Sequence, residues 1–523
     1  MNMKKIFRNI LLGGVAASML ASCNLDLVPS TSIPYEDGDL LILNSIDVAE
    51  FQNGVLASYR GLHYGGHYQI PEVMTECFNA TVDFGNNYGF VHRLGDGFVA
   101  NNGDVEGIWA AHYSAIKNYN IAIEQAEMVE DESLLFSAEV LKGMALYCRA
   151  SSYLTLARAF SKDYDPATAE TDLCVPLITK YDQFYKPVRN TMKEVYDQII
   201  DDLDEAEVIF EEAADATDGA FPLNGTPLNL NGQLNAIAPT VDAVKALKAR
   251  YYLDIEEYAD AADMAQEVIE STAGYALASN MEQMEREFML DEGTEAIIRM
   301  FASKAEGTVG CSIYTSVGDT SEEGKFFQPL FIPSKTILNA YDSNDLRFQL
   351  WFPLDKYPVK IQGTLYEGLR MFTKYIGNPT WQTGKNENAA HNCKPLMLAE
   401  MYLIAAEAYA QDGDEGEAKK LLNTLQSARR ASLTDGTLES VKKEWLRETI
   451  GDGQRINCIK RWGDGLPARP AQDAAKDIVQ QTPASDYTER EVEAGHYTLV
   501  WPIPSYEIKI SKELVQNPGY GAE

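Results

Sequence analysis

Residues 396–430 read LMLAEMYLIAAEAYAQDGDEGEAKKLLNTLQSARR, which is a helical pattern followed by a short polar turn and a second helical pattern. Residues 241–269 (VDAVKALKARYYLDIEEYADAADMAQEVI) repeat this organisation. In each stretch an Ala is followed by a Tyr three positions later and by another Ala nine positions after that: Ala249, Tyr252 and Ala261, then Ala406, Tyr409 and Ala418. Small residues at such positions let two helices approach closely, and the Tyr fills the groove between them. The chain is therefore predicted to contain repeated helical pairs.

These pairs resemble the tetratricopeptide arrangement. Ala150 and Tyr153 keep the first spacing without the later Ala, which predicts a degenerate further unit. Apolar residues at helical spacing predict additional helices over residues 108–128 and 190–210. The predicted fold class is mainly α, with a tetratricopeptide-like helical-repeat scaffold.

The middle of the chain has a different composition, because Gly, Pro and aromatic residues replace the helical patterns there. Short strand-like runs cover residues 295–300, 348–352 and 369–375. We expect this part to be a loop-rich, mixed α/β insertion. The predicted parts are an N-terminal helical part at 41–272, the insertion at 273–394, and C-terminal helices with a terminal segment at 395–523.

The charge of the chain argues against one large class of partners. Its 523 residues include 44 Lys and Arg against 78 Asp and Glu, a formal net charge of −34. Affinity for nucleic acid comes mainly from Lys and Arg that displace counterions from phosphates, so DNA and RNA are not expected to bind. Hydrophobic residues make up 45% of the chain and charged residues 23%, as in globular proteins, so a large core is expected.

The first residues have the pattern of an export signal. A basic start, MNMKKIFR, precedes an apolar run at residues 10–20 that is too short to span a bilayer. The run ends in LASC at Cys23, which resembles the lipobox of bacterial lipoproteins, where the Cys is acylated and becomes the mature N-terminus. We predict a signal peptide at 1–22, a lipid on Cys23 and a polar tether at 23–40. An ordinary secretory signal with an incidental Cys is the alternative.

The other cysteines and the histidines form no recognisable metal or redox motif. The cysteines are scattered without a C-x-x-C pair: Cys77, Cys148, Cys174, Cys311, Cys393 and Cys458. They could pair in an oxidising compartment, but helix-like surroundings favour core positions for Cys148 and Cys458. His63 and His67 have a metal-ligand spacing, but a Gly-Gly pair interrupts the helix between them and no H-E-x-x-H glutamate is present. We predict a loop or polar contact for these histidines, no metal and no cofactor.

Ordered motifs along the chain are similar to those of the SusD and RagB family of Bacteroidetes surface lipoproteins. They are CNLDLVP at 23–29, Trp109 with Tyr113, Ile116 and Asn120, VRNT at 188–191 with Val195, Tyr196, Asp202 and Leu203, LAEMYLIAAEA at 398–408, Arg461 with Trp462 and Gly463, WPIP at 501–504 with Glu507 and Ile508, and QNPGY at 516–520. The chain has WLRETI at 445–450 and DGQR at 452–455 where the family usually has E-R-x-x-E-L and E-G-x-R. Ser511 and Lys512 replace an Asn-Pro that often precedes the last motif. These departures indicate a divergent member with the same fold.

The resemblance implies a role in nutrient capture. Members of the family hold nutrients, usually glycans, for a TonB-dependent outer-membrane transporter. The chain is therefore expected to be a non-enzymatic, lipid-anchored outer-membrane protein that faces the cell exterior and passes oligosaccharide to a SusC-like transporter. Two alternatives remain open: uptake of peptides or protein fragments, as in RagB-like members, and a structural helical-repeat adaptor on the periplasmic face.

Candidate ligand-binding residues follow from the chemistry of sugars. A neutral sugar lays its C–H faces on aromatic rings, while amides and carboxylates take its hydroxyl groups. The resemblance implies that loops of the N-terminal part and of the insertion form the ligand surface. The predicted ligand-binding residues are Trp381, Tyr88, Tyr64, Tyr68, Asn86 and Asn87, near which lie Tyr59, Phe84 and Phe90. Packing on a neighbouring helix is the alternative for each Tyr, and Trp109 and Trp351 are expected to be core residues.

Overall fold

The computed structural model describes residues 39–95, 97–180, 182, 186–304, 316–354, 356–382, 384–472 and 478–521. Its contacts divide the chain into Met1–Leu43 and one compact unit, Asn44–Glu523. The predicted signal peptide, Cys23 and Cys311 lie outside the described residues. Among the helices that the structure describes, none combines the length and the apolar character needed to cross a membrane.

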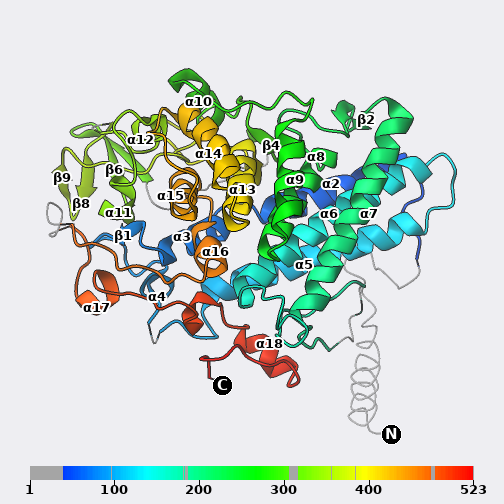
Figure 1. Cartoon of the computed structure of the whole chain (residues 1–523), viewed down its shortest axis with the longest axis horizontal. Coiled ribbons are helices and arrows are strands. Elements are labelled where there is room, and N and C mark those ends of the chain that lie inside the picture. The colour runs from blue at the N-terminus through cyan, green and yellow to red at the C-terminus, as the bar shows by residue number, and fades with distance from the viewer. Residues whose placement is uncertain are drawn as a thin grey trace, which may run out of the picture. The chain divides into compact units, whose positions relative to one another are not determined.

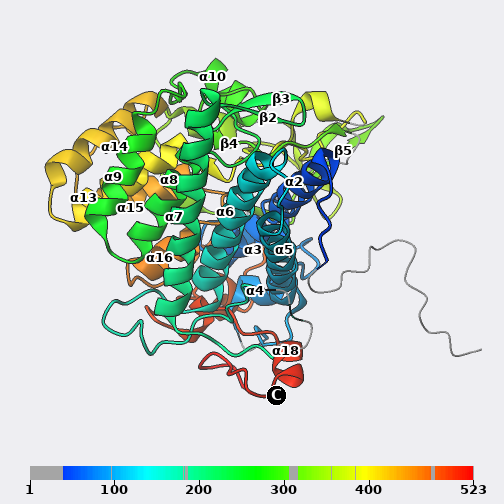
Figure 2. The ribbon, with the colours of Figure 1, turned by 90° about the vertical axis from the view of Figure 1, so that its right-hand side faces the viewer.

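A row of helices forms the larger part of the compact unit (Figures 1 and 2). In chain order it contains α5 (Gly103–Glu127), α6 (Leu135–Phe160), α7 (Met192–Thr217), α8 (Val241–Asp254), α9 (Tyr258–Ile269), α13 (Leu398–Gln411) and α14 (Glu415–Arg429). Each helix packs against the next one in this order, and α2 (Ser45–Gly61) packs on both α5 and α6. The two predicted helical pairs are therefore α8 with α9 and α13 with α14, and α6, which carries Ala150 and Tyr153, packs against α7. The mainly α fold is confirmed.

Local sequence signals start and hold these helices. Thr191 begins α7 with a capping box, because its hydroxyl accepts from the backbone N–H of Glu194 and the Glu194 carboxylate accepts from that of Thr191. The repeated small residues are fully buried: Ala249, Ala261, Ala406 and Ala418. Tyr409 of α13 accepts a hydrogen bond of 2.6 Å from Gln266 of α9. The second helix of one pair is thereby fastened to the first helix of the next.

Buried ion pairs explain why the LAEMYLIAAEA motif contains two glutamates. Glu400 accepts from Arg250 of α8 at 2.5 and 2.6 Å. Glu407 accepts from Arg461 and from the indole N–H of Trp462, each at 2.8 Å. A buried charge that loses its partner is costly, so these contacts fix α13 against α8 and against the C-terminal segment.

Shorter elements complete the unit. The helices among them are α3 (Gly66–Met74), α4 (Gly89–Arg93), α10 (Met281–Phe288), α11 (Lys335–Leu338), α12 (Leu346–Trp351), α15 (Leu438–Glu448), α16 (Arg455–Arg461), α17 (Ala484–Tyr487) and α18 (Ser505–Ile510), with 3-10 turns η2 (Pro379–Trp381) and η4 (Tyr497–Leu499). Strands β2 (Ala220–Leu223) and β3 (Thr226–Asn229) form a hairpin after α7.

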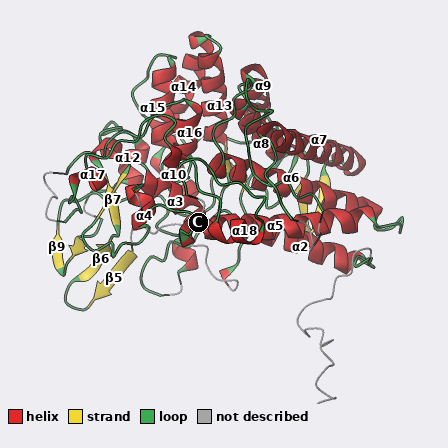
Figure 3. Ribbon diagram, turned by 90° about the horizontal axis from the view of Figure 1, so that it is seen from below, coloured by secondary structure: helices red, strands yellow, loops and turns green. Residues whose placement is uncertain are grey.

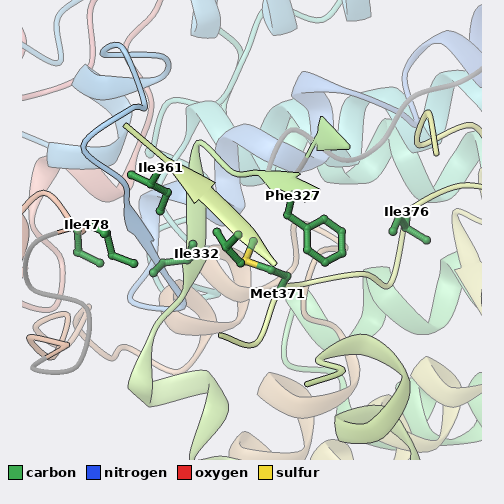
Figure 4. Close-up of a cluster of buried hydrophobic side chains, with 8 residues drawn as sticks. Phe327, Ile332, Ile361, Met371, Ile376 and Ile478 are labelled. Atoms are coloured by element: carbon green, nitrogen blue, oxygen red, sulfur yellow. The ribbon is translucent and has the colours of Figure 1, made fainter. Parts of the chain in front are cut away.

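The insertion contains a small sheet with its own core. Strands β5 (Ser316–Thr320), β6 (Gly324–Gln328), β8 (Val359–Ile361) and β9 (Thr364–Tyr366) lie in the order β5-β6-β8-β9. Figure 3 shows β5, β6 and β9 at one end of the unit and α2, α6 and α7 toward the other. The core, drawn in Figure 4, consists of Phe327, Ile332, Val359, Ile361, Met371, Ile376, Ile478 and Val479.

Segments from both ends of the chain complete this core. Strand β1 (Phe78–Ala80) pairs antiparallel with β7 (Phe331–Pro333). On its other side, Thr81 forms a bridge with Val479, whose neighbour Ile478 accepts from the backbone N–H of Val82 at 3.0 Å. The insertion is thus held by an N-terminal strand and a C-terminal segment that are far apart in sequence.

The prediction of a strand over residues 348–352 is wrong, because this run lies in helix α12. Asp345 caps the helix by accepting from the backbone N–H of Arg347 at 2.8 Å. A short apolar run such as FQLWF fits a strand and a buried helical turn equally well, so its pattern could not decide. Trp351 and Trp109 are buried, which confirms both as core residues.

The other two strand-like runs had different outcomes. Residues 295–300 contain strand β4 (Ala296–Ile298), which pairs with β10 (Leu396–Met397). Residues 369–375 do not form a strand, although Met371 and Phe372 are buried there. They are irregular because their side chains fill the insertion core while few of their backbone groups meet a neighbouring strand.

A network of buried charges ties α12, α14 and α15 together. Arg347 donates to Asp345, Glu444 and Glu448 at 2.6 to 2.7 Å, and Arg429 donates to Glu295 and Glu448 at 2.7 to 2.8 Å. Each of these arginines therefore faces carboxylates. We term Arg347, Arg429, Asp345, Glu295, Glu444 and Glu448 the carboxylate network.

Candidate functional site

The turn between α2 and α3 carries Tyr64, and Tyr88 lies beside the start of α3. Gly65 reverses the chain there with φ +56°, a conformation that favours glycine. The Tyr88 hydroxyl lies 3.9 Å from the place where a Cβ on Gly66 would stand, and 3.4 Å from the side-chain oxygen of Gln69. Tyr64 is 39% exposed and Tyr88 is half-buried. Part of each ring is therefore exposed to solvent near this turn.

Asn86 and Asn87 lie at an exposed loop just before Tyr88. Asn86 accepts from Arg93 at 2.8 Å, and Asn87 donates to the carbonyl of Phe84 at 2.6 Å. Phe90 is exposed, and Arg93 lies 5.4 Å from the centre of its ring. The loop is thus held by its own contacts and presents amide groups to solvent.

Tyr68 is half-buried and lies beside His63. Its hydroxyl lies 3.0 Å from Nδ1 of His63, which is the polar contact predicted for this histidine. Tyr68 lines two cavities of about 50 and 90 Å³ that share part of their walls. Tyr59 and Phe84 are core residues.

The histidines around Tyr68 are uncharged. Burial lowers the pKa of His63 to about 3 and that of His67 to about 4. His67 lies edge-to-face against His112, with 5.4 Å between ring centres. Within the described part of the chain, no group of three or more His, Cys, Asp or Glu side chains could hold a metal ion.

Trp381 ends the 3-10 turn η2 and is half-buried. Asn378 caps this turn by accepting from the backbone N–H of Thr380 at 3.0 Å, and it donates to the carbonyl of Leu290 at 2.8 Å. The carbonyl of Trp381 accepts from Asn388 at 3.5 Å. Hydrogen bonds before and after Trp381 therefore hold this turn in place, although it lies in a loop.

An open hollow lies beside this turn, where the loop after Trp381 passes over the sheet. It has a volume of about 580 Å³ and is lined by Asp319, Thr320, Ser321, Gly384, Lys385, Asn386, Glu387 and Asn388. Glu387 anchors the loop by accepting from Lys325 at 3.0 Å and from Tyr357 at 2.7 Å. The hollow offers hydroxyl groups from the turn between β5 and β6, and amide and carboxylate groups from the anchored loop.

One short segment connects the α2–α3 turn to the Trp381 loop. Arg60, at the end of α2, donates to the carbonyl of Phe301 at 2.5 Å, and Lys304 donates to the carbonyl of Gln382 at 2.8 Å. Residues 301–304 therefore contact both the end of α2 and the loop after Trp381. The Phe301 side chain is 57% exposed. We term Tyr64, Phe301 and Trp381 the aromatic seam.

Sequence reasoning missed Phe301. It lies in FASK, a stretch without helical or strand periodicity. An aromatic residue in such a stretch indicates a ring that a loop presents for contact, and this pattern can be recognised in the sequence. The contact of Phe301 with Arg60 could not be predicted from the sequence, because it joins residues 241 positions apart.

The departure from E-G-x-R leaves the local structure intact. Asp452 accepts from Lys374 at 2.7 Å and from the hydroxyl of Tyr375. Gly453, at φ +71°, donates its N–H to Glu72 at 2.8 Å. Burial raises the pKa of Glu72 to about 8, so this carboxyl is largely protonated at neutral pH.

Family models match two parts of the sequence. The model of the SusD family matches residues 318–520, and a SusD-like model described as "Starch-binding associating with outer membrane" matches residues 36–216. A SusD-like protein of Formosa agariphila is 24% identical over 434 residues, which cover 74% of this chain and 78% of that protein.

Solved structures share the fold. A SusD superfamily protein from Bacteroides thetaiotaomicron VPI-5482 has a TM-score of 0.72 at 22% identity, with 90% of this chain and 99% of that chain covered. A laminarin-binding SusD-like protein has a TM-score of 0.66 at 20% identity, with 91% and 100% covered. The architecture is that of a tetratricopeptide-like protein with a mixed α/β insertion. The chain belongs to the SusD/RagB family.

Proposed function

We propose that this protein is a non-enzymatic, glycan-binding lipoprotein of the outer membrane. Cys23 would carry the lipid, and the body would capture oligosaccharide outside the cell and deliver it to a SusC-like TonB-dependent transporter. The observation that carries the proposal is the aromatic seam, in which Tyr64, Phe301 and Trp381 come from three separate segments of the chain.

The chemistry of the seam suits a sugar chain. Aromatic rings bind the C–H faces of sugars, and a glycan also needs partners for its many hydroxyl groups. The hollow beside Trp381 supplies such partners, among them Thr320, Asn386 and Asn388. Two comparisons favour a glycan over a peptide: the starch-binding description of the matching family model, and the laminarin-binding structure with the same fold.

Calorimetry of the mature protein against a panel of glycans and peptides tests this proposal. We expect one glycan class to bind, and we expect Trp381→Ala combined with Tyr64→Ala to weaken that binding at least tenfold without lowering Tm. Phe136→Ala is a matched control, because Phe136 is an exposed aromatic residue on α6 outside the seam.

Other outcomes would redirect the proposal. Binding of peptides without any glycan would favour peptide uptake, and unchanged glycan affinity in the double variant would move the site away from the seam. Protease treatment of intact cells tests the surface location, since an inaccessible protein would contradict capture outside the cell. Copurification of a TonB-dependent transporter tests the partner.

A further inference from the structure

Two arginines are buried at the C-terminal end of α3. Arg469 is 0% exposed and Arg490 is 8% exposed. Their hydrogen bonds go to backbone carbonyl oxygens: Arg469 to Val73, Met74, Thr75 and His92 at 2.7 to 3.2 Å, and Arg490 to Met74 at 3.0 Å. Carbonyl oxygens at a helix end carry partial negative charge. They satisfy some of the N–H groups but do not neutralise two guanidinium ions.

The remaining nitrogens of both side chains have no protein acceptor in the described part of the chain. They are Nη1 of Arg469 and both Nε and Nη1 of Arg490. Two acceptors near them, Oε2 of Glu76 and Nε2 of His92, also have no described protein partner. Each Nη1 carries two N–H groups and Nε carries one, so the N–H donors outnumber these acceptors.

The charge is unbalanced as well. The negative charge of Glu76 favours the protonated forms of Arg469 and Arg490. The other carboxylate oxygen of Glu76 accepts a hydrogen bond from Arg455 at 2.6 Å. Three arginines therefore share one buried carboxylate, with a weaker contribution to Arg490 from the partly exposed Asp486.

The two arginines also affect each other. Burial and the neighbouring Arg490 lower the pKa of Arg469 well below its ordinary value, and burial lowers the pKa of Arg490 to about 10. Arginine side chains remain protonated in proteins, so both guanidinium groups are charged at neutral pH. The excess of positive charge therefore persists in the folded protein.

We propose that a monatomic anion, of the size and charge of chloride, binds between Arg469 and Arg490. A chloride-sized ion supplies the missing negative charge and accepts several N–H bonds at once, as buried donors require. Water can satisfy the hydrogen bonds but not the charge. The near-complete burial of both arginines favours a single atom over a phosphate or a carboxylate ligand.

Thermal unfolding of the mature protein in sodium chloride and in sodium gluconate of equal ionic strength tests this site. We expect Tm to rise by roughly 1 to 3 °C with chloride, in a saturable manner, because a ligand of the folded state stabilises it by mass action. Bromide should act in the same way, and gluconate is too large to enter. Equal Tm values in both salts would overturn the proposal and indicate water at these nitrogens.

A variant and a control locate the effect. Arg490→Gln should abolish the chloride-dependent part of Tm. Arg286→Gln, which removes an exposed arginine 3.8 Å from Glu292, should keep it. A chloride response that survives in Arg490→Gln would contradict this placement.

Crystals of the wild-type protein grown with bromide give a second measurement, which does not depend on the variant folding. We expect an anomalous peak between the Arg469 and Arg490 side chains. A peak elsewhere, or none at this position, would overturn the assignment. Neither experiment involves a glycan, so its outcome is independent of the proposed function.

Discussion

The two clusters of buried arginines in this protein are stabilised in different ways. In the carboxylate network, Arg347 and Arg429 face carboxylates at 2.6 to 2.8 Å. At the end of α3, Arg469 and Arg490 face backbone carbonyl oxygens. Both arrangements hold distant segments together, but only the first one has enough carboxylates for its arginines, since Arg469 and Arg490 share Glu76 with Arg455. The first should therefore fail when a carboxylate is lost, and the second should respond to ions in solution.

The largest effect is expected from Glu448→Gln. Glu448 accepts from both Arg347 and Arg429, at 2.7 Å each, so the change removes one charge from two buried ion pairs at once, while Asp345, Glu444 and Glu295 remain. We expect the free energy of unfolding to fall by about 3 to 5 kcal/mol, which is typical for breaking a buried ion pair on one side. Urea denaturation measures this value.

Glu439→Gln is the matched control for that experiment. Glu439 lies on the same helix, α15, but its ion pair with Lys443 at 3.3 Å is exposed. Exposed pairs contribute about 0.5 kcal/mol or less, so the control should unfold close to the wild type. A similar loss in both variants would contradict the special role of the carboxylate network.

The same carboxylate should make folding sensitive to acid. Burial alone would raise the pKa of Glu448, but Arg429 and Arg347 overcome this and hold the pKa below its ordinary value of 4.5. A carboxyl whose pKa is depressed by folding stabilises the folded state above its unfolded pKa, and this contribution is lost as the pH falls through the folded value.

The expected result is a loss of stability that begins near pH 4.5 and continues toward lower pH. Chemical denaturation at a series of pH values from 6 downward, taken as the difference between wild type and Glu448→Gln, isolates the contribution. We expect this difference to shrink as the pH falls. A difference that stays constant across the series would show that Glu448 does not titrate as described.

The sequence predicted the parts of the fold that depend on local pattern. The spacing of Ala249, Tyr252 and Ala261 identified two helices correctly, because periodicity over a long segment reports one buried face. The run at 348–352 was assigned wrongly, since its helix depends on the cap at Asp345 and on buried partners about 100 positions away.

The candidate site could be predicted in part for the same reason. The aromatic residues Tyr64 and Trp381 are recognisable in polar loops, but the link between these loops through residues 301–304 depends on hydrogen bonds made by Arg60 and Lys304. Tyr68 has the same local sequence signals as Tyr64 but is half-buried, contacts His63 and lines two cavities. Such differences arise from tertiary contacts that no local pattern encodes.

Arg60 provides the smallest expected effect on stability and sharpens the comparison between the two clusters. Like Arg469 and Arg490 it donates to a backbone carbonyl, that of Phe301, but it lies at a partly exposed position where water can solvate its charge. Arg60→Gln should therefore change the free energy of unfolding by no more than about 1 kcal/mol. It should still weaken glycan binding several-fold, because Phe301 would no longer be held beside the α2–α3 turn. Calorimetry and urea denaturation on the same variant separate the two effects, with Arg286→Gln as the control. A large loss of stability would mean that the carbonyl-bound arginines of this protein are essential regardless of burial, whereas unchanged binding would mean that Arg60 does not position the seam.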